Sequence, residues 1–207
     1  MKKFLAGILA AGLIFTAFSF SKNELLGIGE KAPLMDTKMP DVSGKEYSLN
    51  DLKKENGLLV IFSCNTCPYV IAWEDTYPEL GKLTQSNNVG MALVNSNEAK
   101  RNGDDSMDEM KNHFKKAGYN SAYVIDSKSM LADAFGARTT PHVYLFNSDM
   151  ELVYRGAIDN KYETQDDVAT KFYLNDAINA LAKGEKINPA ETKQTGCSIK
   201  RVRPKKS

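Results

Sequence analysis

Short apolar runs alternate with amphipathic stretches through most of this chain. The runs at 57–63 (GLLVIFS), 89–95 (VGMALVN) and 122–126 (AYVID) are typical of strands buried on both faces. Between them, apolar side chains recur every three or four positions over 68–85, which is the period of a helix, and a polar stretch with an acidic start leads into a second predicted helix over 106–117. We predict one bend, at Pro78, because a proline inside a helix costs about 3 kcal/mol.

The second half of the pattern adds a hairpin and a closing helix. Strands are predicted at 142–147 and 151–158, joined through a turn at 147–150, with helices at 130–135 and 166–183 that each end at a glycine. Two weak strands near 34 and 45–48 and a capped helix at 48–54 come first. The order β-α-β-α-β-α-β-β-α predicts an α/β fold, with a central mixed, mostly parallel sheet, helices on both faces and a terminal antiparallel hairpin.

The first residues have the pattern of an export signal. Met1-Lys2-Lys3 is followed by an uncharged, mostly apolar run to residue 20, with small residues near its end at Ala17 and Ser19. We therefore expect a signal peptide at 1–20, a linker at 21–28, one domain at 29–184 and an irregular basic tail at 185–207. Export to the periplasm follows from the signal, and an uncleaved membrane anchor is the alternative.

The charge balance of the chain limits the classes of partner that it can bind. The 207 residues carry 27 basic and 26 acidic side chains, so the surplus that nucleic acid requires is lacking. Six basic residues and no acid lie between 193 and 207, which favours a solvated end, with peripheral contact to an anionic membrane as the alternative. The sequence predicts neither an oligomeric state nor a cofactor.

The segment SCNTCPYV carries the candidate chemistry. Cys64 follows a predicted strand and Cys67 falls in the first turn of the next helix, where the helix dipole favours a thiolate. We expect Cys64 to attack a disulfide and Cys67 to resolve the mixed disulfide. This assignment requires Cys64 to be ionised near neutral pH and accessible. The alternative, two buried small hydrophobic residues, is less consistent with this spacing, and a closed zinc site lacks ligands beyond Cys197, His113 and His142.

A second feature is the segment ARTTPHVYLF. Pro141 directly before a buried strand indicates a Thr140–Pro141 bond that is cis, which would aim the Thr140 backbone at the cysteines for β-type pairing with substrate. Alternatively, Pro141 only ends the loop. We interpret His142 as a hydrogen-bonded strand residue, with a role in tuning a thiolate or holding copper as the alternative.

Three further side chains have simpler interpretations. Trp73 is expected in the core, His113 on the surface, and Asp159 as a cap of the turn after the last strand.

Several segments resemble a known family. CNTCP and TTP resemble the thioredoxin superfamily, and NTCPYV, RTTPHVYLF, LVYRGAIDN and TGCSIK are similar to bacterial peroxiredoxin-like, redoxin-domain proteins over residues 29–200. The resemblance implies a thioredoxin-like fold, a redox pair of Cys64 and Cys67, a cis-proline loop at Thr140 and Pro141 for substrate, and an auxiliary redox role for Cys197. For Cys197 itself, an electron relay and a thiol that docks the tail both stay open.

The sequence departs from true peroxiredoxins. These have a proline seven residues and a threonine or serine three residues before the peroxidatic cysteine, whereas the positions before Cys64 hold Gly57 and Ile61. Thiol–disulfide exchange with protein thiols, recharged by a membrane electron donor, is therefore the leading hypothesis. Antioxidant, thiol-dependent peroxidase activity and a Cu(I) metallochaperone using the same cysteines are the alternatives.

Overall fold

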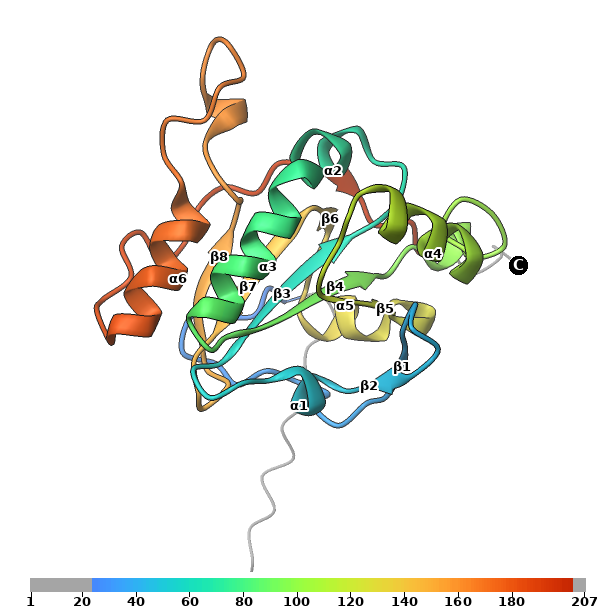
Figure 1. Cartoon of the computed structure of the whole chain (residues 1–207), viewed down its shortest axis with the longest axis horizontal. Coiled ribbons are helices and arrows are strands. Elements are labelled where there is room, and N and C mark those ends of the chain that lie inside the picture. Colours follow the sequence, from blue (N-terminus) through green and yellow to red (C-terminus); the bar gives the residue numbers. More distant parts are fainter. Residues whose placement is uncertain (1–23, 203–207) are drawn as a thin grey trace, which may run out of the picture.

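The computed structural model describes residues 24–202, built around one five-stranded sheet (Figure 1). Its strand order is β5-β4-β3-β7-β8. The pairs β3–β4 and β4–β5 are parallel, whereas β3–β7 and β7–β8 are antiparallel. The sheet is thus evenly mixed in its pairings. The strands are β3 (Leu58–Ser63), β4 (Gly90–Asn95), β5 (Ala122–Ile125), β7 (His142–Phe146) and β8 (Leu152–Gly156).

Helices cover both faces of this sheet, as the pattern predicts. Alternate residues of β3 point to opposite sides, so Leu59 and Ile61 join one apolar cluster and Leu58, Val60 and Phe62 the other. The first cluster is covered by α2 (Pro68–Trp73), α3 (Tyr77–Ser86), α4 (Met107–Lys116) and α6 (Tyr173–Lys183). The second is covered by α1 (Leu49–Leu52) and α5 (Met130–Ala134).

The predicted bend near Pro78 is present. The helical stretch divides into α2 and α3 with a 3-10 turn at Glu74–Thr76 between them, and Pro78 lies in the first turn of α3. A proline is tolerated there because the amide it lacks would have no helical partner.

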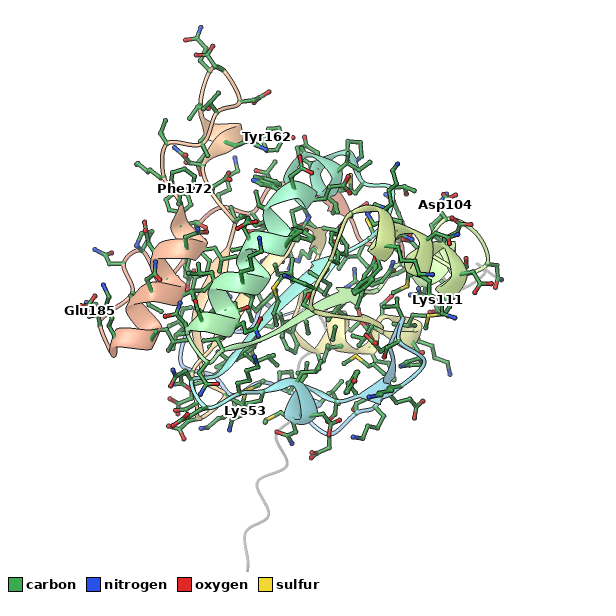
Figure 2. All side chains as sticks on the ribbon, viewed as in Figure 1. Lys53, Asp104, Lys111, Tyr162, Phe172 and Glu185 are labelled. Atoms are coloured by element: carbon green, nitrogen blue, oxygen red, sulfur yellow. A yellow bond between two sulfur atoms is a disulfide. The ribbon has the colours of Figure 1, made fainter. Side chains whose placement is uncertain are left out.

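The expected helix over 166–183 is shorter than the pattern predicts. It begins at Tyr173, and the preceding residues form a projecting loop that contains a 3-10 turn at Lys161–Glu163 (Figure 1). Figure 2 labels Tyr162 in this turn and Phe172 directly before the helix. The side chain of Asn160 explains the difference, because its Oδ1 accepts from the amides of Thr170 and Lys171 at 2.8 Å. The hydrogen bonds of these two amides to Asn160 therefore close the loop.

The small elements before β3 are also shifted. Strand β1 (Met39–Pro40) pairs with β2 (Glu46–Tyr47), and Leu34, expected near a strand, instead adopts a left-handed backbone with φ 55°. The capped helix is confirmed as α1, with a capping box between Ser48 and Asp51.

Both ends of the described chain pack against the domain. In the segment expected as a linker, Leu26 is buried and its amide donates to the Phe135 carbonyl at 3.1 Å. In the tail expected to be irregular, β9 (Cys197–Ser198) pairs with β6 (Thr139–Thr140). The predicted signal peptide at 1–20, the first three residues of the expected linker and residues 203–207 lie outside the described residues. Within 24–202, no helix combines the length and apolar character needed to cross a bilayer.

Candidate redox site

Both cysteines of the CxxC motif lie where β3 runs into α2. Cys64 directly follows the last residue of β3, and Cys67 is the N-cap of α2 with Pro68 in its first turn. The sequence therefore places the two sulfurs at the carboxyl end of the central strand, the edge where ligand sites of α/β sheets occur.

Cys67 forms its disulfide with Cys197, not with Cys64. The Cα atoms of Cys67 and Cys197 are 6.1 Å apart although 130 positions separate them in the chain. Cys64 is the free cysteine. The expected redox pair is therefore replaced in this structure by a pair that ties the tail to the motif, with the third thiol beside it.

Thr140 contacts both sulfurs of the motif. Its bond to Pro141 is cis, as the sequence indicates, and its hydroxyl Oγ1 lies 3.3 Å from Cys64 Sγ. Its carbonyl oxygen lies 3.2 Å from Cys67 Sγ. Thr140 is also paired with Cys197 in the β6–β9 ladder. The backbone edge expected to receive a substrate strand is thus occupied by the protein's own tail.

The expectation that Cys64 is an exposed thiolate is wrong for this state. The side chain is only 2% exposed, and burial raises the pKa of its thiol, with the nearby Asp105 carboxylate adding to the increase. Hydrogen bonds from the Thr140 hydroxyl and from the amides of Cys67 and Thr66 act in the opposite direction but are outweighed. The helix that was expected to lower the pKa begins at Pro68, four residues further on.

A buried polar network holds the loop between the cysteines. Asp105 is fully buried, and its Oδ1 accepts from the Asn65 amide at 3.0 Å and from Asn95 Nδ2 at 2.8 Å. Its Oδ2 accepts from Asn97 Nδ2 at 3.0 Å. Tyr123 completes the support by donating its hydroxyl to Asn65 Oδ1 at 2.8 Å. The shape of the motif is therefore set from β4, β5 and the loop before α4.

Sequence reasoning missed this network. Its only signal is a run of short polar side chains at the carboxyl end of the buried strand β4, from its last residue Asn95 through Ser96 and Asn97. Such residues at the carboxyl end of a parallel strand are candidates for supporting a site, and all three are buried here.

A pocket of about 260 Å³ opens beside the cysteines. The three sulfur-bearing residues contribute to its wall, together with Thr140, Lys100 and Lys200. Lys100 and Lys200 are the charged residues of its lining, and Lys100 forms an ion pair with Asp104.

His142 does not join the cysteines. It alternates with Tyr144 and Phe146 on the face of β7 that belongs to the second apolar cluster, whereas Cys64 and Cys67 lie in the first. Burial, and then the charge of Arg155, lower the pKa of His142 to about 3, so the ring is neutral at physiological pH. Within 24–202 the structure shows no cluster of three or more His, Cys, Asp or Glu side chains suited to a metal. A copper site that uses His142 is therefore not supported.

Three other expectations can be compared with the structure. Trp73 is buried in the core, with its ring edge-to-face against Tyr162. His113 is not simply exposed, because its Nε2 lies 3.0 Å from a carboxylate oxygen of Glu74. Asp159 accepts from the Lys161 amide at 2.8 Å and so caps the turn after β8.

A central mixed sheet, a CxxC motif before a helix and a cis-proline opposite it define a thioredoxin-like redox protein. The family model for the AhpC/TSA family matches residues 28–155, and the chain belongs to that family. This membership supports oxidoreductase activity in general. Among curated proteins, no sequence gives a significant match.

Solved structures agree on the fold. A hypothetical protein from Sinorhizobium meliloti is 25% identical, with a TM-score of 0.79 over 87% of this chain and 98% of its own. An uncharacterized conserved protein from Geobacillus kaustophilus is 26% identical, also with a TM-score of 0.79, over 90% and 97%. The thioredoxin domain of a Bacteroides vulgatus thiol-disulfide oxidoreductase is 17% identical, with a TM-score of 0.57 over 76% and 99%, which shows likeness of fold alone.

Proposed function

We propose that this protein is a thiol–disulfide oxidoreductase in which one disulfide is exchanged among Cys64, Cys67 and Cys197. The observation that carries the proposal is the Cys67–Cys197 disulfide with the free thiol of Cys64 three residues away and Thr140 in contact with both motif sulfurs. Thiolate attack on a neighbouring disulfide is the elementary step of such enzymes.

The internal step is balanced without an outside oxidant. Cys64 gives up its proton and attacks Cys67 Sγ, a Cys64–Cys67 bond forms, the Cys67–Cys197 bond breaks, and Cys197 leaves as a thiolate that takes up a proton. The raised pKa of Cys64 keeps this step slow until the thiol is deprotonated. The exchange releases the tail from the motif.

With protein substrates, the same sulfurs pass two electrons. The reduced protein attacks a substrate disulfide through Cys67, and a second thiolate of the cluster opens the mixed disulfide and releases the substrate as a dithiol. A dithiol donor then reduces the chain again, for which a membrane protein in an exported setting is our candidate. Export and a periplasmic location are parts of this proposal that rest on residues 1–20 alone, with a retained membrane anchor as the alternative.

The roles of the cysteines differ from the sequence-based expectation. Because Cys67 is the sulfur joined to the paired strand β9, we assign it the bond to substrate. Cys64 is buried, with its sulfur in contact with the Thr140 hydroxyl, and we assign it the role of the resolving thiol.

Reduction of insulin disulfides by dithiothreitol tests this function. Cys67→Ser should lower the protein-catalysed rate of insulin reduction at least 100-fold, because no mixed disulfide forms at that position. Cys197→Ser should change this rate several-fold. Ser198→Ala is the matched control, since it alters the same strand without removing a sulfur, and should stay within two-fold of wild type. Wild-type protein that does not accelerate the reaction, or a fully active Cys67→Ser variant, would contradict the proposal.

Thiol-dependent peroxidase activity is a second candidate, favoured by the AhpC/TSA family match. The burial and raised pKa of Cys64 argue against it, because the thiolate is the species that reacts with peroxide. Stopped-flow mixing of the reduced protein with hydrogen peroxide decides between the two. We expect Cys64 to react no faster than free cysteine, and a rate 1,000-fold higher would instead support the peroxidase.

A further inference from the structure

The backbone of the tail from Gly196 to Arg201 is held by hydrogen bonds on both of its sides. On one side, Cys197 and Ser198 pair with β6, and the Ile199 amide donates to the Arg138 carbonyl at 2.9 Å. On the other side, the Lys200 amide donates to Asn97 Oδ1 at 2.8 Å, and the Lys200 carbonyl accepts from the Ala99 amide at 2.8 Å. Figure 1 shows β9 in red beside β6. The tail therefore lies extended in a groove, as a bound peptide does.

The groove restricts the residue before the cysteine. A Cβ added to Gly196 would lie 2.3 Å from the Thr140 carbonyl oxygen and 2.7 Å from its carbon. Both of these atoms belong to the backbone next to the cis-proline, which cannot turn away as a side chain can. Only glycine fits at this position while the next residue is paired with Thr140.

Two later positions also make side-chain contacts. Ile199 is 6% exposed and belongs to the same apolar cluster as Leu131 and Phe135. Arg201 donates from Nε to Asp133 Oδ1 at 2.7 Å and from its Nη2 to the Ala137 carbonyl at 2.7 Å. Ser198 and Lys200, between these positions, are exposed. The groove thus selects four positions of the tail, in the order Gly196, Cys197, Ile199 and Arg201.

We propose that this groove is the substrate site of the enzyme and that the tail is an intramolecular mimic of the substrate. The inference rests on the proposed function and deepens it by naming a substrate class. The substrates are extended protein segments in which glycine precedes the reactive cysteine, an apolar residue stands two positions after it, and a basic residue four positions after it. Internal transfer of the disulfide to Cys64–Cys67 frees Cys197 and opens the groove, and reduction of the new disulfide by the dithiol donor then gives the Cys67 thiolate that reacts with these substrates.

The reaction on a bound segment follows from the place of Cys197. The reactive substrate sulfur takes the position of Cys197 Sγ, and the Cys67 thiolate attacks it. The new Cys67–substrate bond forms as the substrate's own S–S bond breaks, and the second substrate sulfur leaves as a thiolate. Cys64 then attacks Cys67, and the segment departs as a thiol. Two electrons pass from the cysteines of the chain to the substrate.

The test uses the full chain with Cys64→Ser and Cys197→Ser, which leaves Cys67 as its sole cysteine. The probe is the peptide Thr-Gly-Cys-Ser-Ile-Lys-Arg, activated at its cysteine as a 2-pyridyl disulfide. Attack by Cys67 releases pyridine-2-thione, which is followed by absorbance. We expect replacement of the peptide's glycine by alanine, or of its isoleucine by aspartate, to slow the release at least ten-fold. Rates within two-fold for all three peptides would overturn the proposal.

Two controls distinguish a failure of this substrate proposal from a failure of the proposed function. A small 2-pyridyl hydroxyethyl disulfide measures the intrinsic reactivity of Cys67, and its failure to react would count against the proposed function itself. Adding Ile199→Asp weakens the docking of the tail, so the matched peptide should react at least three-fold faster while the small disulfide reacts equally. An unchanged peptide rate would show that the tail does not occupy the peptide's site.

Discussion

Cys64 shows how the surroundings of one residue set the reactivity of the motif. Its thiol is enclosed by the cis-proline loop, and burial dominates the polar contacts that favour the thiolate. The Cys67–Cys197 disulfide removes the other two thiols from titration. In the oxidised protein, Cys64 is therefore a protected thiol beside a disulfide.

The raised pKa of Cys64 predicts a dependence of stability on pH. In the unfolded chain the thiol ionises above about pH 8.5, while the folded protein still holds the proton. The unfolded state then binds fewer protons, so the free energy of unfolding falls as pH rises. Denaturant unfolding at pH 7.5, 8.5 and 9.5 should show a steeper fall for oxidised wild type than for Cys64→Ser. Parallel slopes would mean that the pKa of Cys64 is not raised.

Asp105 predicts a second effect at this scale. Asp105→Asn removes a negative charge that raises the pKa of Cys64, and its single acceptor oxygen cannot serve all three donors of the network. We expect a lower pKa of Cys64, from alkylation rates measured against pH, and a stability loss of about 1–3 kcal/mol. Asp104→Asn is the control, because Asn65 bonds to the backbone carbonyl of Asp104 and that bond survives. An unchanged alkylation profile in Asp105→Asn would contradict the charge effect.

At the scale of elements, the sequence pattern was most informative for the strands buried on both faces. The apolar runs predict β3, β4 and β5 to within a residue or two, because such a strand is apolar at nearly every position and its ends are therefore marked by polar residues. The sequence pattern failed over 166–172. It predicts helix there, but the backbone amides of Thr170 and Lys171 donate hydrogen bonds to the Asn160 side chain. A single distant hydrogen-bonding residue is not visible in a local window.

The start of β3 offers a test of close packing. Gly57 has φ 125°, and a Cβ there would lie 2.0 Å from the Phe146 carbonyl oxygen. Gly57→Ala should therefore cost more than about 2 kcal/mol of stability, since backbone strain and overlap add. Gly44 is the matched control, with φ 84° and nothing within 4 Å, so Gly44→Ala should cost only about 1 kcal/mol. Equal losses in urea unfolding would show that the strand can move aside.

At the scale of the whole molecule, the C-terminal tail returns to the redox motif and is joined to it by the Cys67–Cys197 disulfide. The candidate residues Cys64, Cys67, Thr140 and Pro141 were identifiable from the sequence because local motifs mark them. The pairing of Cys67 with Cys197 was not, because it spans 130 positions and three cysteines allow three pairings. Because of that long-range contact, the tail occupies the backbone edge at Thr140 that was expected to receive substrate.

The Cys67–Cys197 link predicts a stability difference between redox states. A disulfide that closes a long loop restricts the unfolded chain, and reduction should lower the free energy of unfolding by roughly 2–4 kcal/mol. Urea unfolding of wild type with and without reductant measures this. Cys64→Ser keeps the link and should lose as much on reduction, whereas Cys197→Ser should lose less. Identical midpoints for oxidised and reduced wild type would contradict a stabilising link.

The most direct measurement maps disulfides by mass spectrometry after equilibration in glutathione buffers of graded ratio. Oxidised wild type and Cys64→Ser should both contain Cys67–Cys197, and Cys197→Ser should form Cys64–Cys67 in its place. That result would show that Cys67 is shared between two partners. A Cys197→Ser variant whose Cys64 and Cys67 both stay free, in buffers that fully oxidise wild type, would contradict exchange among the three cysteines.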